Sequence, residues 1–266
     1  MISLKPFSTR IALLALLTAP FASHAQDDES RADGWGVGVG VSIRSTLYAG
    51  EDNRTLPFPL VNYEGERYYV KGPVIGYKFI DNASFTLNGF VAARFDGVDA
   101  KDFGRSALAA RGINRDLLED RDMAADIGVS AVFKTDTAGE FELDLRADAT
   151  NTSDGYQASL DYRYPFEAGP VKLIPSIGVV SLSDKLANYY YGTLPKEVAR
   201  GVVDYRPGSA IITRAGFTAI LPTSPRWAFI AIVSADAYPD EITDSPLIDA
   251  GTDIVPSIFL GVIRIF

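Results

Sequence analysis

The sequence predicts an all-β protein, a transmembrane antiparallel β-barrel of the outer-membrane type with about twelve strands; ten strands remain an alternative. Three observations lead to this prediction. Apolar and polar residues alternate over long segments, the N-terminal segment resembles an export signal, and the connections alternate between short and long. Alternation with a period of two indicates strands with one apolar face, and about ten residues let a tilted strand cross a bilayer.

The N-terminal segment predicts export from the cytoplasm. Lys5 and Arg10 flank the start of an apolar run at residues 11–22, and "SHA" at residues 23–25 fits a small-x-small cleavage site. These features are typical of a secretory signal peptide. We therefore expect a signal peptide at residues 1–25 and a single barrel domain at residues 26–266, with a buried N-terminal helix as the alternative.

The first predicted strand covers residues 34–44 and begins with "GWGVGVGVSI". Every second residue from Trp35 to Ile43 is large and apolar, and the residues between them are glycine or serine. In a membrane barrel, the large side chains would face lipid. The glycines would leave room in the lumen or let neighbouring strands approach closely.

The remaining strands follow the same alternation. It is sharpest in "EFELDLRADA", where Leu143 and Leu145 alternate with Glu142 and Asp144. We break the region around residues 67–80 at Gly72-Pro73, because a single strand there would put the loop at 96–122 on the periplasmic side. The predicted strands after the first are 56–63, 67–71, 74–80, 84–95, 123–134, 140–150, 155–165, 170–182, 208–221, 226–237 and 253–266.

The connections predict the orientation of the barrel. Outer-membrane barrels have short periplasmic turns and long outside loops. We place the long loops 96–122, 184–207 and 238–252 outside, and both termini in the periplasm. The periplasmic turns are then 64–66, 81–83, 135–139, 167–169 and 222–225. The segment 107–122 could form a short helix that packs on the barrel mouth, or stay mobile.

Charged residues on the polar faces of the strands predict an ionic inner wall. A pair of carboxylates could suggest a glycosidase, but ion pairing along adjacent strands is the simpler interpretation. The residues predicted to face the lumen are Arg94, Glu140, Glu142, Asp144, Arg146, Asp161, Arg163 and Lys172.

The composition argues against an enzyme. The chain has no cysteine, and its single histidine, His24, lies in the predicted signal peptide. A Ser-His-Asp triad and a thiolate nucleophile are therefore excluded from the mature chain, and we expect neither a cofactor nor a metal. The mature chain keeps 23 basic against 34 acidic residues, a formal charge of −11. Such an acidic chain is a poor candidate for binding nucleic acid.

Two further segments suggest contacts with the envelope. The chain ends in "LGVIRIF", and Phe266 resembles the C-terminal signal read by the outer-membrane assembly machinery, although Arg264 departs from its usual apolar residue. The acidic loop "DEITDSPLIDAGTD" at residues 240–253 could share divalent cations with lipopolysaccharide phosphates, but its spacing is not that of an EF-hand. A solvated loop is the alternative.

Four segments together resemble the MipA/OmpV family. They are "YAGEDNRTLPFPLVNYEGERYY", "ALAARGINRD", "NYYYG" and "DEITDSPLID". Their distinctive residues are Tyr48, Gly50, Pro57, Pro59, Arg67, Tyr191, Gly192, Ser245, Pro246 and Leu247. The resemblance implies an outer-membrane barrel and a non-catalytic scaffold role that links a lytic transglycosylase to a murein synthase. A narrow channel for small solutes, or a surface protein of adhesion or osmotic response, is the alternative.

Overall fold

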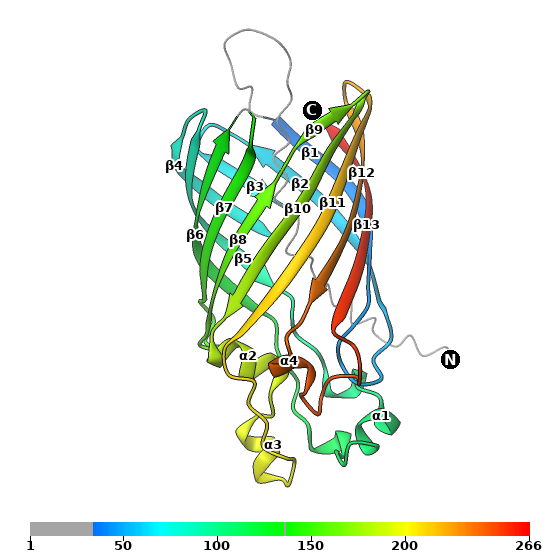
Figure 1. Cartoon of the computed structure of the whole chain (residues 1–266). Helices are drawn as coiled ribbons and strands as arrows, with labels where there is room; N and C mark the ends of the chain where they lie inside the picture. Colours follow the sequence, from blue (N-terminus) through cyan, green and yellow to red (C-terminus); the bar gives the residue numbers. More distant parts are fainter. Residues whose placement is uncertain (1–33, 136) are drawn as a thin grey trace, which may run out of the picture.

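The chain forms a closed antiparallel β-barrel (Figure 1). The computed structural model describes residues 34–135 and 137–266, so the predicted signal peptide lies outside the described residues. The strands are β1 (Gly34–Arg44), β2 (Arg54–Glu64), β3 (Tyr68–Lys71), β4 (Val74–Asp81), β5 (Phe85–Arg94), β6 (Ala124–Thr135), β7 (Gly139–Asp148), β8 (Tyr156–Arg163), β9 (Phe166–Ala168), β10 (Val171–Leu182), β11 (Ala210–Ser224), β12 (Trp227–Ala237) and β13 (Ile254–Ile265).

The thirteen labelled strands fill twelve positions in the barrel wall. Strands β8 and β9 occupy one position, because both pair with β10 and only Tyr164 and Pro165 separate them. The ring closes where β1 pairs with β13, with Gly36 opposite Ile265. The prediction of twelve strands is confirmed, and the alternative of ten is wrong.

Two predicted turns are shorter in the structure than in the sequence-based prediction. Glu167 belongs to β9, so the β9–β10 turn contains only residues 169–170, and β11 runs on to Ser224. The pairing of β11 with β12 shifts register between Pro222 and Ser224. A register shift accommodates an extra residue at the end of a hairpin, which explains why Pro222 does not end the strand.

Glycines let the first strand pack closely against its neighbours. A Cβ at Gly38 would lie 2.0 Å from the carbonyl oxygen of Val262, and a Cβ at Gly40 would lie 2.4 Å from the Phe259 ring. The large residues between the glycines point away from the lumen, and Val39 is 65% exposed. The alternation in β1 therefore separates a lipid-facing surface from an inner face without room for side chains.

Apolar side chains also fill part of the lumen. One cluster lies on the inner faces of β2 and β10 to β13 and consists of Phe58, Leu60, Ile174, Ile220, Ala228, Ile230, Ile232, Phe259 and Ile263. Most of the polar side chains described below lie on β5 to β8. Among the described residues, no helix is long and apolar enough to cross a membrane.

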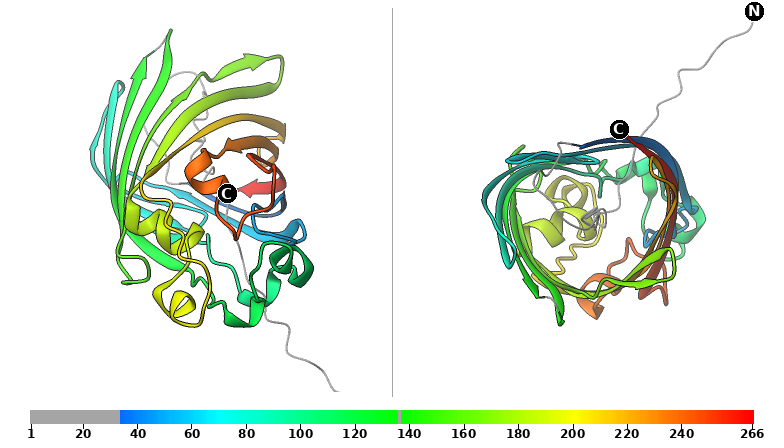
Figure 2. Two further views of the ribbon diagram at one scale, coloured as in Figure 1. Left: turned by 60° about the horizontal axis from the view of Figure 1, so that its bottom comes forward. Right: turned by 90° about the horizontal axis from the view of Figure 1, so that it is seen from above.

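The two ends of the barrel differ (Figures 1 and 2). The turn end carries short hairpin turns and the C-terminus, whereas the loop end carries the longer connections. The helices of the loop end are the 3₁₀ turns Ala100–Asp102 and Arg115–Leu117, and α1 (Arg105–Ala109), α2 (Asp184–Tyr191), α3 (Pro195–Ala199) and α4 (Asp240–Thr243). That the loop end faces the cell exterior stays a prediction.

The barrel wall is incomplete between β2 and β5. The β3–β4 hairpin turns back at Gly72-Pro73, as the sequence predicted, and its pairing with β2 stops at Asn62. Nearer the loop end, β2 continues to Arg54, and this part of the strand pairs with β1 on its other side. No pairing joins β2 to β5 in the residues that the structure describes. We call this part of the wall the gap.

Two prolines line the gap. The amide of Gly72 donates to the carbonyl oxygen of Val61 at 2.9 Å, so the backbone groups of Val61 point toward the hairpin. Those of Pro59 and Pro57 point the same way, because alternate residues of a strand share one hydrogen-bonding side. Proline has no N–H and is found on strand edges. The open edge of β2 therefore lacks two donors that would otherwise be unpaired.

Candidate functional site: the loop cap and the cavity beneath it

Four loops pack into a cap over the loop end. They are residues 45–53, 95–123, 183–209 and 238–253. Figure 2 shows their helices lying across the opening of the barrel. Buried residues from each loop form the core of the cap, including Leu47, Phe103, Leu108, Leu118, Leu186, Ile242 and Leu247.

The predicted helix within segment 107–122 is part of this cap. Helix α1 overlaps the start of the segment, and Leu108 and Leu118 are buried, with Leu117 half-buried against them. Of the two alternatives for this segment, a helix packed on the barrel mouth or a mobile loop, the structure therefore shows the packed one.

Family-motif residues from three loops meet in the cap. The Tyr48 hydroxyl donates to the carbonyl oxygen of Tyr190 at 3.0 Å, and its ring stacks on that of Tyr191 with centroids 6.3 Å apart. The Ser245 hydroxyl donates to the carbonyl oxygen of Tyr191 at 2.6 Å. The amide of Ala49 donates to the carbonyl oxygen of Leu247 at 2.9 Å. These motifs therefore join the loops to one another.

Two motif glycines sit where a side chain would collide with backbone. Gly50 has a positive φ of 67°, and a Cβ there would lie 2.8 Å from the Cα of Gly104. A Cβ at Gly192 would lie 2.7 Å from the carbonyl oxygen of Asn188. Both positions therefore need glycine for the loops to pack. Pro246, the residue after Ser245, stands in the same loop as Leu247.

A buried ion pair holds two loops of the cap together. Glu197 lies in α3 and is fully buried, and its partner Arg121 has a side chain only 1% exposed. The Arg121 guanidinium donates to both carboxylate oxygens, at 2.7 and 3.0 Å. The amides of Glu119 and Leu194 also donate to this carboxylate, at 2.8 and 2.7 Å.

A polar cavity lies in the lumen under the cap. It has a volume of about 130 Å³ and reaches from Arg94 and Asp126 on the wall to Tyr190 in α2. The Arg94 guanidinium donates to the Asp126 carboxylate at 2.6 Å and to the Gln157 side chain at 3.1 Å. The charges at this wall are therefore paired within the protein.

The other predicted wall residues also form ion pairs. Arg163 lies 2.6 Å from Glu142 and 3.7 Å from Glu140. Arg146 lies 2.7 Å from Asp144.

The pairing continues toward the cavity. Asp161 accepts a hydrogen bond of 2.7 Å from Arg214. Lys172 is half-buried on β10, opposite Glu167 and Ile220. Neutralised pairs of this kind give a polar but charge-balanced wall.

Tyrosines of the cap line the cavity or lie next to it: Tyr191 and Tyr238 line it, and Tyr48 stacks on Tyr191. Burial raises the pKa of Tyr48 and of Tyr191, and it raises the pKa of Tyr238 to about 12. These phenols therefore stay protonated at neutral pH. The Tyr238 hydroxyl accepts a hydrogen bond of 3.0 Å from Arg44, whose guanidinium also lies 2.9 Å from Asp236.

The last two predicted residues lie at the turn end. Arg67 is exposed in the β2–β3 turn, with its guanidinium 3.4 Å from the Tyr77 hydroxyl. Phe266 is 67% exposed, and the Arg264 guanidinium lies 4.7 Å from its ring centroid. Arg264, the residue that differs from the usual C-terminal signal, thus lies over the Phe266 ring.

Sequence reasoning missed the residues that build the cap and the gap. Arg121, Glu197 and Glu51 were not singled out, because isolated charges in long loops carry no pattern. Across residues 34–135 and 137–266, no group of three or more His, Cys, Asp or Glu side chains is placed to hold a metal ion.

Comparisons with known proteins agree with the barrel. A family model described as MltA-interacting protein MipA matches residues 37–266. The outer membrane protein YiaT of Escherichia coli (strain K12) is 27% identical over 241 residues, which cover 89% of this chain and 92% of YiaT. The MltA-interacting protein of the same strain is 27% identical over 248 residues, 91% of this chain and 94% of that protein. Among solved structures, the NanC porin aligns with a TM-score of 0.46 and 9% identity over 85% of this chain and 98% of that chain.

Proposed function

Because the chain belongs to the MipA family, as its sequence resemblance predicted, we propose that this outer-membrane barrel is a non-catalytic scaffold that holds murein-remodelling enzymes at its turn end. The observation that carries the proposal is the packed cap over the loop end. A relative that is 27% identical over 91% of this chain bears the name MltA-interacting protein. A scaffold for lytic transglycosylase and murein synthase needs an anchored barrel and an accessible periplasmic surface, not an open pore.

The lumen supports a structural role over bond cleavage. Its carboxylates are engaged by Arg94, Arg146, Arg163 and Arg214. General acid–base catalysis needs a group that is free to exchange a proton with a substrate. The wall carboxylates instead contribute to packing of the barrel.

The turn end offers a small surface for a partner. The exposed residues Glu66 and Arg67 lie in the β2–β3 turn, and Arg226 lies in the β11–β12 turn. A specific stable interface buries about 1,200–2,000 Å² in total, which is more than short turns provide. The contact is therefore weak, or it also uses the tail at residues 26–33, which lies outside the described residues.

A capture experiment tests the scaffold. The full-length protein is expressed in its envelope, crosslinked and purified, and captured lytic transglycosylase and murein synthase are identified by mass spectrometry. Arg67→Glu at the turn end should reduce capture, whereas Arg105→Glu, an exposed arginine at the loop end, should leave it unchanged. Deletion of residues 27–32 should also reduce capture without unfolding the barrel.

The cavity under the cap favours one other function, a narrow channel. This cavity lies in the lumen and is lined by polar groups of the wall and the cap, among them Arg94, Asp126 and Tyr190. Purified barrels in planar bilayers would then show discrete conductance steps. Conductance together with no capture of either enzyme by the intact protein would replace the scaffold with the channel.

A further inference from the structure

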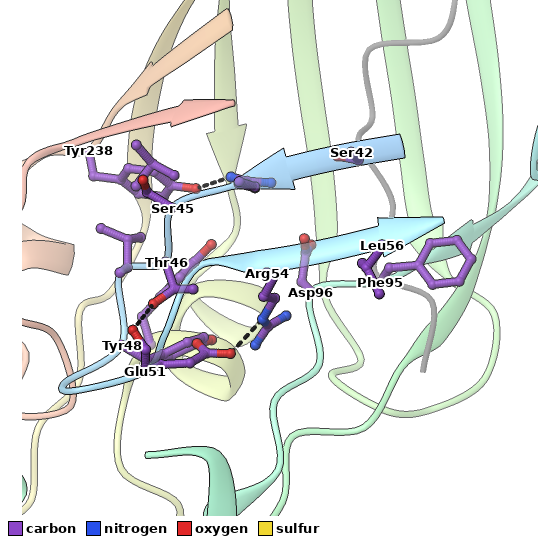
Figure 3. A pocket seen from close by; sticks show the side chains of 14 residues that line it. Ser42, Ser45, Thr46, Tyr48, Glu51, Arg54, Leu56, Phe95, Asp96 and Tyr238 are labelled. Carbon is purple, nitrogen blue, oxygen red and sulfur yellow. Dashed lines mark hydrogen bonds and ion pairs between the residues drawn. The ribbon is translucent and has the colours of Figure 1, made fainter. Parts of the chain in front are cut away.

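A second pocket lies where the incomplete wall meets the cap. We call it the gap pocket. Leu56 of β2 and Phe95, the residue after β5, both line it, so the pocket touches the strands on either side of the gap (Figure 3). Arg54 closes the gap toward the loop end, because its guanidinium donates to the carbonyl oxygen of Gly97 at 3.1 Å.

The gap pocket contains a buried carboxylate oxygen without a donor. The Glu51 side chain is only 7% exposed, and its Oε1 accepts a hydrogen bond of 2.5 Å from Arg54. Its second oxygen, Oε2, is buried without a hydrogen-bond partner in the described chain. A buried polar atom that is left unpaired costs free energy, and burial accordingly raises the pKa of Glu51. This oxygen suits a ligand that donates a hydrogen bond.

The charges around the gap pocket balance. Glu51 and Asp96 supply two carboxylates, and Arg44 and Arg54 supply two guanidinium groups. Arg44 also pairs with Asp236 at 2.9 Å and Asp96 with Arg94 at 3.0 Å, so the two signs stay equal in number. Hydroxyl groups of Ser42, Ser45, Thr46 and three tyrosines line the remaining polar surface. A balanced set of both signs fits a zwitterionic group better than a ligand with a single charge.

The gap lies at the height of apolar side chains on the lipid-facing side of the barrel. Ile43 of β1 lies opposite Thr55 of β2 and opposite Ile258 of β13, so these positions share one height on the wall. Ile43 and Ile258 are 44% and 46% exposed. Large apolar side chains on the outer face mark the band that contacts hydrocarbon. A group held between Leu56 and Phe95 therefore lies at the height of this apolar band.

We propose that the gap pocket binds a membrane lipid whose head carries a primary ammonium group and a phosphate. The ammonium group donates to Oε2 of Glu51, the phosphate lies near Arg44 and Arg54, and an acyl chain leaves through the gap between Leu56 and Phe95. The prolines at positions 57 and 59 suit this use, because an edge without N–H groups presents no unpaired donors to the chain. This site lies at the opposite end of the barrel from the proposed scaffold surface.

Native mass spectrometry of the intact barrel tests the head-group contact. The probes are lysophosphatidylethanolamine and lysophosphatidylcholine, which differ in that the second has no N–H donor. The wild-type barrel should retain the ethanolamine probe at least about tenfold more tightly, since each 1.4 kcal/mol corresponds to a factor of ten. Glu51→Gln should abolish this preference, and Asp52→Asn, an exposed acid at the next position, should preserve it. Equal retention of both probes by the wild type would overturn the proposal.

Photo-crosslinking tests the route of the acyl chain. An ethanolamine lysolipid with a diazirine in its tail should label residues 55–60 and Phe95 more strongly than the lipid-facing residues of β6 and β7. Leu56→Trp should remove this labelling, whereas Val39→Trp, on the lipid face of β1, should not. Heat-modifiable migration on a gel confirms that each variant is folded. Even labelling around the wild-type barrel would refute the route, irrespective of the variants. This result would not bear on the scaffold proposal, which is tested separately by capture at the turn end.

Discussion

Replacing Glu197 with alanine should release the cap while leaving the barrel folded. Its carboxylate receives two hydrogen bonds from Arg121 and two from backbone amides. The variant leaves the Arg121 guanidinium buried beside two unpaired amides. Removing one partner of a buried ion pair costs about 3–5 kcal/mol. A penalty of about 1.4 kcal/mol is a factor of ten, so opening of the cap should become roughly a hundred- to several thousand-fold more frequent.

Hydrogen exchange measured by mass spectrometry reads out this opening. Amides of segments 183–209 and 95–123 should exchange faster in Glu197→Ala, whereas β6, β7 and β12 should be unchanged. The matched control is Arg105→Ala, which removes an ion pair with Asp116 whose side chains are 58% and 59% exposed. Exposed pairs contribute little to stability, so the control should exchange like the wild type. Equal exchange of the cap in Glu197→Ala and in the control would refute the reasoning.

Three further predictions concern the lipid face, the orientation and the gap pocket. Leu145→Arg should destabilise the barrel in vesicles by about 2–4 kcal/mol, more than Glu142→Gln does, as measured by urea unfolding; equal losses would contradict the assigned faces. Cysteines at Lys196 and Asp244 should react with an impermeant maleimide on intact cells, and reaction only after the outer membrane is opened would reverse the orientation. Burial raises the folded-state pKa of Glu51 above its ordinary value of 4.5, so the folded state holds more protons there and stability falls as pH rises through this window. Hydrogen exchange of residues 45–53 should therefore show the wild type gaining stability relative to Glu51→Gln as pH falls toward 4.5, and a pH-independent difference would contradict this.

Most of the barrel could be predicted from the sequence, because its strands obey a strict local rule. Each side chain of a strand faces either lipid or lumen, and the two solvents select opposite residue types. The alternation of Leu143 and Leu145 with charged residues therefore defines β7 without knowledge of its neighbours. The break at Gly72-Pro73 could also be predicted, because a single strand there would put the long loop 96–122 on the side of the short turns; the structure shows Gly72 with a positive φ of 57° at this break.

The cap could not be predicted from the sequence, because it depends on contacts between distant segments. Arg121 and Glu197 are separated by 76 positions, and neither belongs to a periodic segment. The strand ends were also imprecise: β2 begins at Arg54, before the predicted start at residue 56. The family motifs marked Tyr48, Tyr191 and Ser245 as distinctive without indicating that they contact one another.

The prolines at positions 57 and 59 show why the gap could not be predicted from local sequence patterns. In the sequence they argue only for an edge strand, and a closed barrel has no edges. The two statements agree only if the wall is locally open, which requires the neighbouring hairpin to be shorter than β2. Its length in turn follows from the turn at Gly72-Pro73. The cap covers the end of the lumen and the gap leaves one side of β2 without a ladder partner, so the pocket between them is lined both by cap residues such as Tyr191 and by the wall residues Leu56 and Phe95.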